Sequence, residues 1–425
     1  MRFGAPDLAM VMLSELRRLR LIDGQRRSAR LADLVVDLST GDYPLVTRVL
    51  FRDARGKQMA LPWDAVTDIS WRLARLRVGD LATARAAPAE SLARSVLLVR
   101  DIMDALVLDV VERHAMRAND LWLRLEDGRL WLHAADVSPW AVLRRLGRGL
   151  LGRGGERHLV DWSDIEFLRG NPRAAQAGGD YHRRIARLTP PAIARLADQV
   201  PYHHAAELLT LIPDTVAADT LETMAPERQL QVFEDLDDDQ AVRLLALMAP
   251  DLAADLAGRL QPAYAQSCLE SLPPQRAARI IELLRYPEDT AGGIMTNEFP
   301  VVAAQLTIAQ ARTALRDELS TPDFAYYVYV VDDLDSHHLE GVLTLRDLIV
   351  ASDAAAVREV MRSQLVTIDA LEPALVAARQ VIEQHLAALP VVARDGRLLG
   401  VVTVDAAVAL VAPVTWRQDA PRLFS

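Results

Sequence analysis

Cysteine is almost absent from this sequence of 425 residues, because Cys268 is the only one. A single cysteine cannot form an internal disulfide or a CxxC zinc or redox motif, and this fits a reducing compartment. Long uncharged apolar runs are missing as well, since the most apolar stretches, residues 95–111 and 398–414, are interrupted by charged residues or proline. Neither offers the roughly 18 uncharged residues that a membrane-spanning helix needs. The sequence therefore predicts no disulfide and no transmembrane segment.

Signals for secretion and for catalysis are missing too. The N-terminus lacks the charged start, long apolar run and small-residue cleavage site that together mark a signal peptide. No GxSxG, P-loop, HExxH or Cys/His arrangement occurs along the chain. With 51% hydrophobic and 25% charged residues, the composition is that of a folded globular protein. We therefore expect a cytoplasmic protein of about two to four domains that is not an enzyme.

The formal net charge of −10 is unevenly distributed. Residues 1–180 carry 28 basic and 24 acidic side chains, whereas residues 181–425 carry 20 and 34. An acidic C-terminal region disfavours nonspecific binding of nucleic acid and suits cations, or it serves only to keep the surface soluble. We therefore expect no DNA partner, and the charge alone leaves the other two interpretations open.

The N-terminal part of the sequence predicts two related β-modules, at residues 1–80 and 92–170. Each has short apolar strands, a turn that contains acid, arginine and glycine, and a closing tryptophan motif, PWDAV at Trp63 and DWSDI at Trp162. We expect both tryptophans to fill the module cores rather than to bind a ligand. The predicted strands are residues 34–36, 46–51 and 59–61 in the first module and residues 98–109, 120–125 and 130–133 in the second.

These two modules resemble the PRC-barrel family, in which a strand pair, an acidic glycine turn and a terminal W-x-x-[VI] motif recur. The resemblance implies two small β-barrels that dock a protein or RNA partner, and it implies no catalysis. A glycine-rich insert in the second module predicts a loop that is either solvated or in contact with RNA or phospholipid. The arginines of this insert are Arg144, Arg145, Arg148, Arg153 and Arg157.

A period of 12 residues marks the next region, residues 183–287. Apolar anchors recur at this spacing, and proline follows most of them within one to three residues. Because proline ends one helix and is accepted in the first turn of the next, each unit is predicted to be one short helix. Helices this short need neighbours to bury their apolar faces, so we expect an α-helical solenoid. The anchors are Val200, Ile212, Met224, Leu236, Met248, Leu260, Leu272 and Leu284.

Five carboxylates cluster within this helical region and repel one another unless something screens them. Oxygen-rich sites of this kind suit magnesium or calcium. Asp is also favoured at helix N-caps and in first turns, so capping is the competing explanation. The five residues are Glu234, Asp235, Asp237, Asp238 and Asp239.

From residue 288 the pattern changes to two α/β modules, predicted at residues 288–352 and 353–413 and followed by a tail, residues 414–425. Each module has the order strand, helix, strand, strand, helix. Met295-Thr and Val360-Met open the two modules, YVVD and LPVV form their central strands, and GVLTLRD, which begins at Gly341, closes the first. These residues resemble a pair of CBS domains, and the resemblance implies nucleotide binding and a homodimer formed through the CBS pair.

The run YPEDTAGGIMT, residues 286–296, lies between the helical repeat and this CBS pair. Together with the rest of residues 185–412, it is similar to the cytosolic part of the MgtE family of magnesium channels. The resemblance implies a dimeric magnesium sensor of the kind that controls a membrane channel. The channel itself has no counterpart in this sequence, so transport by this chain alone is not implied.

The resemblance also indicates the ligand sites. The CBS phosphoribose motif needs Thr or Ser and, three residues later, an Asp that bonds both ribose hydroxyls, and Thr344 and Asp347 meet this need. A helix N-cap with an acid at the third helical position is the competing explanation. In the second module Thr403 is followed at that offset by Ala406, so we expect the second cleft to be weak or empty. The predicted nucleotide-binding residues are Thr344, Asp347, Arg346, Val342 and Tyr329.

Asp405 remains where the MgtE family closes its second CBS domain with several acids, whereas Ala406 and Ala409 replace two carboxylates. In the family these acids join those of the helical domain around magnesium. We expect Asp405 and the five carboxylates of the helical region to bind magnesium, with a smaller effect than in a family sensor.

The predicted fold class is multidomain α+β, with two PRC-like barrels, a helical solenoid and a CBS pair. The leading hypothesis is a regulatory protein that reads an adenine nucleotide (ATP, ADP or AMP) or a divalent cation and signals to a protein partner through its barrels. A second is an accessory component of magnesium transport that acts with a separate membrane subunit. A third is an RNA- or ribosome-associated assembly factor, against which the acidic C-terminal half counts.

Overall fold

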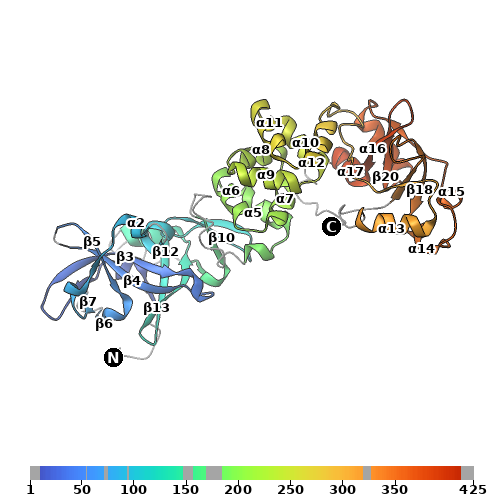
Figure 1. Ribbon diagram of the computed structural model, residues 1–425. Helices are drawn as coiled ribbons and strands as arrows, with labels where there is room; N and C mark the ends of the chain where they lie inside the picture. Colours follow the sequence, from blue (N-terminus) through green and yellow to red (C-terminus); the bar gives the residue numbers. More distant parts are fainter. Residues whose placement is uncertain are drawn as a thin grey trace. The chain divides into compact units, whose positions relative to one another are not determined.

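The computed structural model describes residues 10–53, 55–70, 75–92, 95–146, 157–168, 184–318 and 327–412 (Figure 1). The chain divides into two compact units, residues 1–240 and 241–425. The predicted tail, residues 414–425, and most of the glycine-rich insert, including Arg148 and Arg153, lie outside the described residues. No helix in the described ranges combines the length and the apolar character needed to cross a membrane.

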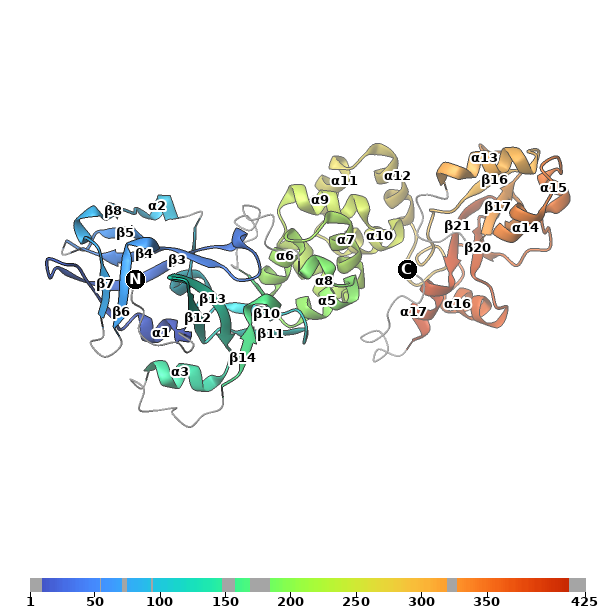
Figure 2. The same ribbon diagram turned by 90° about the horizontal axis from the view of Figure 1, so that it is seen from below.

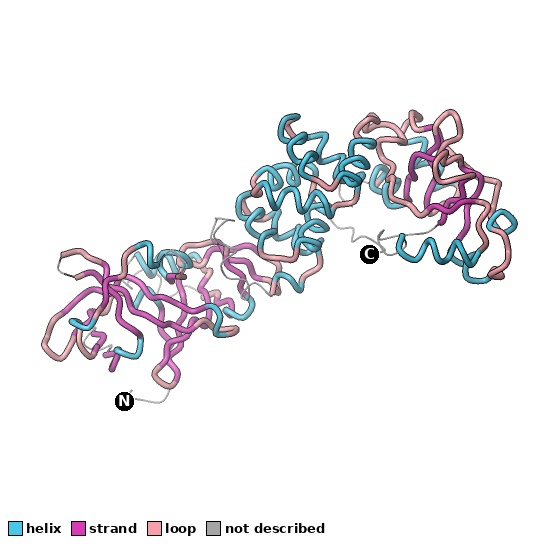
Figure 3. The backbone as a smooth tube through the Cα atoms, viewed as in Figure 1, coloured by secondary structure: helices cyan, strands magenta, loops and turns pink. Residues whose placement is uncertain are grey.

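Strands from both predicted β-modules lie in one sheet of 12 strands (Figure 3, magenta). Its main path is β1-β12-β13-β4-β3-β2-β7-β6, in which Trp131 of β13 pairs with Leu45 of β4 and so joins the two modules. A further sheet has the order β11-β10-β15. The strands are β1 (Met10–Met12), β2 (Arg20–Ile22), β3 (Ser28–Asp37), β4 (Leu45–Arg52), β5 (Gln58–Pro62), β6 (Val66–Ser70), β7 (Arg75–Val78), β8 (Arg85–Ala86), β9 (Val96–Leu97), β10 (Leu106–Asp109), β11 (His114–Arg117), β12 (Asp120–Glu126), β13 (Arg129–Asp136), β14 (Leu159–Asp161) and β15 (Ile165–Phe167).

The first segment of each module pairs with the other module. In β1, Met12 lies opposite Trp122 of β12, and in β9, Leu97 lies opposite Val35 of β3. A short helical turn follows each of these strands, α1 (Leu13–Leu16) after β1 and the π-helical turn η4 (Leu98–Ile102) after β9. The prediction of a strand over residues 98–109 is therefore wrong for its first half, because those residues form the turn that docks on the other module.

Two buried carboxylates hold these exchanged turns in place. Asp33, at 6% exposure, accepts hydrogen bonds from the backbone N–H groups of Val99 (2.8 Å) and Arg100 (3.1 Å) in η4. Asp120, at 1% exposure, accepts the backbone N–H of Ser14 in α1 (3.2 Å). Burial raises the pKa of both carboxyl groups. Each module thus uses the acid of one strand to cap a turn supplied by the other module.

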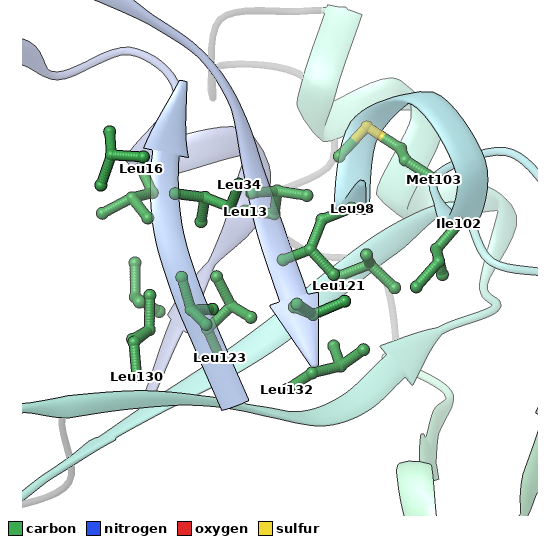
Figure 4. Close-up of a cluster of buried hydrophobic side chains, with 14 of the residues drawn as sticks. Leu13, Leu16, Leu34, Leu98, Ile102, Met103, Leu121, Leu123, Leu130 and Leu132 are labelled. Atoms are coloured by element: carbon green, nitrogen blue, oxygen red, sulfur yellow. The ribbon is translucent and has the colours of Figure 1, made fainter. Parts of the chain in front are cut away.

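The two modules share one hydrophobic core, and Figure 4 shows its centre. Leu13 and Leu16 of α1 and Leu98 of η4 lie there among Leu34 of β3 and Leu121 of β12, and all five side chains are buried. Two separate PRC-like barrels are therefore not confirmed, because strands and core are common to both modules. Trp63 and Trp162 lie in the same cluster, at 3% and 0% exposure, which confirms their prediction as core residues.

The 12-residue period corresponds to one short helix per unit, as predicted. Proline occupies the first turn of α5, α8 and α10 to α12, and the anchors from Val200 to Leu272 are all buried, whereas Leu284 is 39% exposed. In the first unit α5 packs on α7 and α6 on α8, and in the second α10 packs on α12. The helices are α5 (Pro190–Asp198), α6 (Tyr202–Thr210), α7 (Asp214–Thr223), α8 (Pro226–Glu234), α9 (Asp238–Leu247), α10 (Pro250–Arg259), α11 (Pro262–Ser271) and α12 (Pro274–Leu283).

Two three-stranded sheets with their helices complete the second unit, and Figure 2 shows them from below. In each sheet the first strand is parallel and the third antiparallel to the central strand. The first module contains β16 (Val301–Ala303), α13 (Ile308–Glu318), β17 (Tyr327–Val331), β18 (Leu339–Thr344) and α14 (Leu345–Val350). The second contains α15 (Val357–Val360), β19 (Ile368–Asp369), α16 (Ala374–Glu383), β20 (Ala388–Val392), β21 (Leu398–Thr403) and α17 (Val404–Val411).

We predict that Asp33→Ala destabilises the N-terminal unit by about 3 kcal/mol, because it leaves the buried backbone N–H of Leu34 and the part-buried N–H groups of Val99 and Arg100 without this acceptor. The measurement is urea unfolding followed by tryptophan fluorescence, since six of the seven tryptophans lie before residue 240. Asp64→Ala is the matched control, because Asp64 is exposed, and its effect should stay within about 0.5 kcal/mol. Equal midpoints for Asp33→Ala and the wild type would show that the exchanged turn does not depend on this carboxylate.

Candidate nucleotide site

The two α/β modules exchange their opening segments, as the N-terminal modules do. Thr296, which precedes β16, exchanges two backbone hydrogen bonds of 2.9 Å with Val401 of β21. Arg362, which precedes β19, does the same with Val342 of β18, at 2.9 and 3.0 Å. The opening segment of each module therefore lies along the last strand of the other. We keep the names first cleft and second cleft for the surroundings of Thr344 and of Thr403, where residues of both modules meet.

Glycine at two matching positions permits this close approach. A Cβ atom on Gly341 would lie 2.6 Å from Sδ of Met361 and 3.0 Å from the carbonyl oxygen of Arg362. A Cβ atom on Gly400 would lie 2.6 Å from Sδ of Met295 and 2.8 Å from the carbonyl oxygen of Thr296. Because backbone atoms are among these neighbours, a larger residue has to push the exchanged segment off the strand.

Thr344 and Asp347 form a capping box at the start of α14. The Thr344 hydroxyl accepts a hydrogen bond from the Asp347 backbone N–H (3.1 Å) and donates one to Oδ2 of Asp347 (2.7 Å), which also accepts the Thr344 backbone N–H (3.0 Å). The capping explanation is thus confirmed for this pair. Oδ1 of Asp347 makes no hydrogen bond with any described residue, so it is free to accept one from a ligand.

A cation stands beside this carboxylate. Nε of Arg362 lies 3.8 Å from Oδ2 of Asp347, and the Arg362 side chain is 66% exposed. The hydrogen bond from the Thr344 side chain lowers the pKa of Asp347 from its ordinary value, and Arg362 and Arg346 lower it further. The carboxylate is therefore ionised throughout the physiological pH range, next to a guanidinium that is open to solvent.

The second cleft lacks both charged groups. Thr403 caps α17 by accepting the backbone N–H of Ala406 (3.2 Å), but Ala406 stands where the first cleft has Asp347. Thr296, at 5% exposure, stands where the first cleft has Arg362. The two clefts share their backbone frame and differ in charge, so only the first offers an anion and a cation side by side.

The other three residues predicted for the nucleotide site differ in their exposure to solvent. Arg346 is exposed in the first turn of α14, and Val342 lies half-buried on β18 beside Arg362. Tyr329 of β17 is 2% exposed and packs in the cluster between the two sheets, where burial raises the pKa of its phenol. Its ring meets Phe299 edge-on at 5.5 Å. Arg362 was missed from the sequence, because its place beside Asp347 depends on pairing between the modules.

The predicted metal ligands of the helical region lie around the end of α8 and the start of α9. Asp237 caps α9 by accepting the backbone N–H of Gln240 (2.9 Å), and Asp238 and Asp239 occupy the first turn of that helix. Glu234 ends α8 and Asp235 follows it, whereas Asp405 is exposed on α17 in the other unit. The described ranges contain no group of three or more His, Cys, Asp or Glu that could hold a metal ion. Capping accounts for Asp237, and metal binding by these acids stays a prediction.

Comparison with known families assigns both parts of this region. Residues 188–289 match the family described as the MgtE intracellular N domain, and residues 291–354 and 357–412 each match the CBS domain. The crystal structure of the cytosolic domain of the Mg2+ channel MgtE in complex with ATP has 32% sequence identity and a TM-score of 0.52. That match covers 57% of this chain and 96% of the other. Residues 188–412 are homologous to the cytosolic domain of MgtE.

Other relatives agree with this assignment. The soluble part of a magnesium transporter matches with 27% identity and a TM-score of 0.50, over 55% of this chain and 91% of the other. The magnesium transporters MgtE of Enterococcus faecalis and Thermus thermophilus are 37% identical over 124 residues and 41% identical over 123 residues. Each of these two matches covers 29% of this chain and 27% of the transporter. The matched regions belong to regulatory domain families, and neither is an enzyme family.

We predict that Gly341→Ala and Gly400→Ala each loosen the exchanged contacts by roughly 1–3 kcal/mol, because the added methyl group has no room. Hydrogen exchange of the β18 and β21 amides should become about ten- to a hundredfold faster. Gly24→Ala is the control, because a Cβ atom there meets nothing within 4 Å. Unchanged exchange rates in both CBS variants would mean that the segments do not depend on this contact.

Proposed function

We propose that this chain is a regulatory protein that binds one adenine nucleotide, in the first CBS cleft, and passes the bound state on to a partner. The observation that supports this most directly is the asymmetry of the two clefts. Asp347 has a free oxygen for the ribose hydroxyls, and Arg362 offers a cation for phosphate, whereas the second cleft has Ala406 and Thr296 in these places. A small anionic nucleotide therefore fits the first cleft and not the second.

The choice of an adenine nucleotide also draws on the homologous region. The solved MgtE cytosolic domain, to which this chain is similar over 96% of the other chain's length, is in complex with ATP. A carboxylate that holds a ribose cis-diol makes two charge-assisted hydrogen bonds, and these are among the stronger ones in proteins. The chain's own residues thus supply binding and orientation, and the site requires no chemical step.

An accessory role in magnesium transport is the second candidate, because the curated relatives of this region are magnesium transporters. In this role the chain would act with a separate membrane subunit. The acids Glu234, Asp235, Asp237 to Asp239 and Asp405 would then respond weakly to magnesium, since the described ranges hold no formed cation site. Cofractionation with membranes would favour this role over an independent sensor.

A second copy of the chain is the partner proposed for the CBS pair. Several apolar side chains on its helices are exposed, among them Ile349 of α14 at 78%, Leu375 of α16 at 61% and Val411 of α17 at 46%. Leu375 lies seven residues before Ile382, also exposed, and so shares a helix face with it. Exposed apolar stripes on adjacent helices are typical of surfaces that are covered by a partner. Because this region resembles CBS pairs, a second copy of the chain is the simplest partner that would bury these apolar side chains.

The N-terminal β-region is the proposed docking part for a protein partner. Its internal duplication and its tryptophan motifs agree with a pair of PRC-like modules fused into one body. Because its core is continuous across both modules, we expect this region to act as one rigid platform.

We predict that Asp347→Ala weakens ATP, ADP or AMP binding by roughly ten- to a thousandfold. Two charge-assisted hydrogen bonds of about 1.5–3 kcal/mol each are lost, at about 1.4 kcal/mol per decade, and some of this is recovered by water. Isothermal titration calorimetry of the full chain measures this effect, with a stoichiometry of one per chain in the wild type.

The matched control is Thr403→Ala, which removes the equivalent helix cap from the second cleft. Both variants should lose about 1 kcal/mol of stability, because Asp347→Ala removes the acid of a capping box and Thr403→Ala removes an N-cap, but only Asp347→Ala should lose affinity. Equal nucleotide affinity in the wild type and a folded Asp347→Ala variant would assign Thr344 and Asp347 to capping alone.

We predict a homodimer in solution, which the double variant Ile349→Glu, Leu375→Glu converts to a monomer because two charges are placed on the apolar surface. Multi-angle light scattering at micromolar concentration decides this. Leu334→Glu is the control, since Leu334 is 58% exposed in the loop between β17 and β18 and is not part of these helices. A wild-type chain that stays monomeric with and without nucleotide would contradict the proposed dimer.

A further inference from the structure

Four arginines lie in one row across the N-terminal sheet. In neighbouring strands Arg52 of β4 lies directly opposite Arg30 of β3, Arg30 opposite Arg20 of β2, and Arg20 opposite Arg75 of β7. Directly opposite residues point to the same face of a sheet. With neighbouring strands about 4.8 Å apart, the row spans roughly 14 Å. We call Arg20, Arg30, Arg52 and Arg75 the arginine row, and Figure 2 labels β3, β4 and β7, three of the four strands that carry it.

The arginine row faces solvent, because the alternate residues face the core. Leu21, Leu31, Phe51 and Leu76 are the neighbours of the four arginines along their strands, and all four are buried in the shared hydrophobic core. Every member of the arginine row is exposed. Successive side chains of a strand point to opposite faces, so the sheet holds the four guanidinium groups on its outer face.

No acid neutralises this row within the described part of the chain. None of the four side chains forms an ion pair or hydrogen bond with a described residue. The row ends at Gln58 next to Arg52 and at Ser70 next to Arg75, both uncharged. Arg77 is outside the arginine row and lies directly opposite Asp68 of β6. Unlike the members of the row, it therefore has an acidic neighbour. Like charges directly opposite each other destabilise a sheet. The arginine row therefore lowers the stability of this sheet unless an external anion binds to it.

The length of the arginine row limits which kind of anion can engage all four guanidinium groups. One small phosphate can engage about two guanidinium groups, whereas this row presents four over roughly 14 Å, so the partner must be an extended anionic surface. Single-stranded nucleic acid is normally held by aromatic platforms beside the basic groups, and the positions in register with the row, Gln58 and Ser70, are not aromatic. A lipid surface needs only charge and a flat, exposed face. Arginine also suits phosphate headgroups through its bidentate fork, and Lys57 is the only lysine of the chain.

We propose that the arginine row docks the N-terminal unit on an anionic phospholipid bilayer. Each basic side chain near such a surface contributes to binding, the contributions add over the four arginines, and salt screens them. This proposal is independent of the nucleotide site, because it rests on residues of the first unit alone.

The test is flotation of the full chain with vesicles of phosphatidylserine and phosphatidylcholine in equal parts, at low and at high salt. The variant carries Arg20→Gln, Arg30→Gln, Arg52→Gln and Arg75→Gln, and we expect roughly a hundred- to a thousandfold weaker binding. The matched control removes the same charge from exposed arginines of the same unit that lie outside the row, namely Arg85→Gln, Arg113→Gln, Arg117→Gln and Arg129→Gln. The control should retain most of the binding.

Folding of the variant is checked by tryptophan fluorescence, and its stability should equal or exceed that of the wild type because cross-strand repulsion is relieved. Three outcomes would overturn the proposal. The first is that the wild type does not bind the mixed vesicles, or binds pure phosphatidylcholine equally well. The second is that both quadruple variants lose the same affinity for the vesicles, which would mean that binding depends on the net charge of the chain and not on the arginine row. The third is that single-stranded RNA binds through the arginine row while vesicles do not.

Discussion

Both pairs of repeats in this chain depend on a reciprocal exchange of backbone hydrogen bonds. In the N-terminal unit, β1 and α1 complete the second module, and β9 and η4 complete the first. In the CBS pair, the segment at Thr296 lies on the second module and the segment at Arg362 lies on the first. An isolated module would expose the strand edge and the apolar surface that its partner covers. The repeats therefore fold as pairs, and any site at their junction draws residues from both.

The exchange explains why the two CBS clefts can share one backbone and differ in chemistry. The backbone contacts at Gly341 and Gly400 are alike, and so are the helix caps of Thr344 and Thr403. The side chains that face each cleft come from different modules and can change separately. One cleft keeps an ionised carboxylate and a guanidinium, while the other has an alanine and a buried threonine.

Local patterns in the sequence predict the parts that depend on local chemistry. The 12-residue period and its prolines predict the helices α5 to α12, because a helix end and a first turn need only neighbouring residues. The LPVV run, predicted as a central strand, lies in β20. The closing motifs place Trp63 and Trp162 in a core, since a tryptophan between apolar strands is most simply buried.

Non-local pairing accounts for what the sequence does not predict. In residues 98–102 apolar and polar side chains do not alternate strictly, but the segment is apolar enough to be predicted as a strand. It forms a turn because Asp33, far away in sequence, accepts hydrogen bonds from its backbone N–H groups. The merging of two modules into one core depends on the same contacts. Arg362 reaches Asp347 only through the pairing with Val342, and no local motif marks it. The acids of the helical region were predicted from charge alone, which does not distinguish a cap from a ligand.

We propose that the first CBS cleft binds a nucleotide and that the second does not. Hydrogen exchange of the full chain with and without ATP, followed peptide by peptide, tests it most directly, because it reports both clefts in one experiment. We expect protection of residues 341–347 and 360–363 and no change at residues 294–297 and 400–407. Protection of both clefts, or of the second alone, would contradict it.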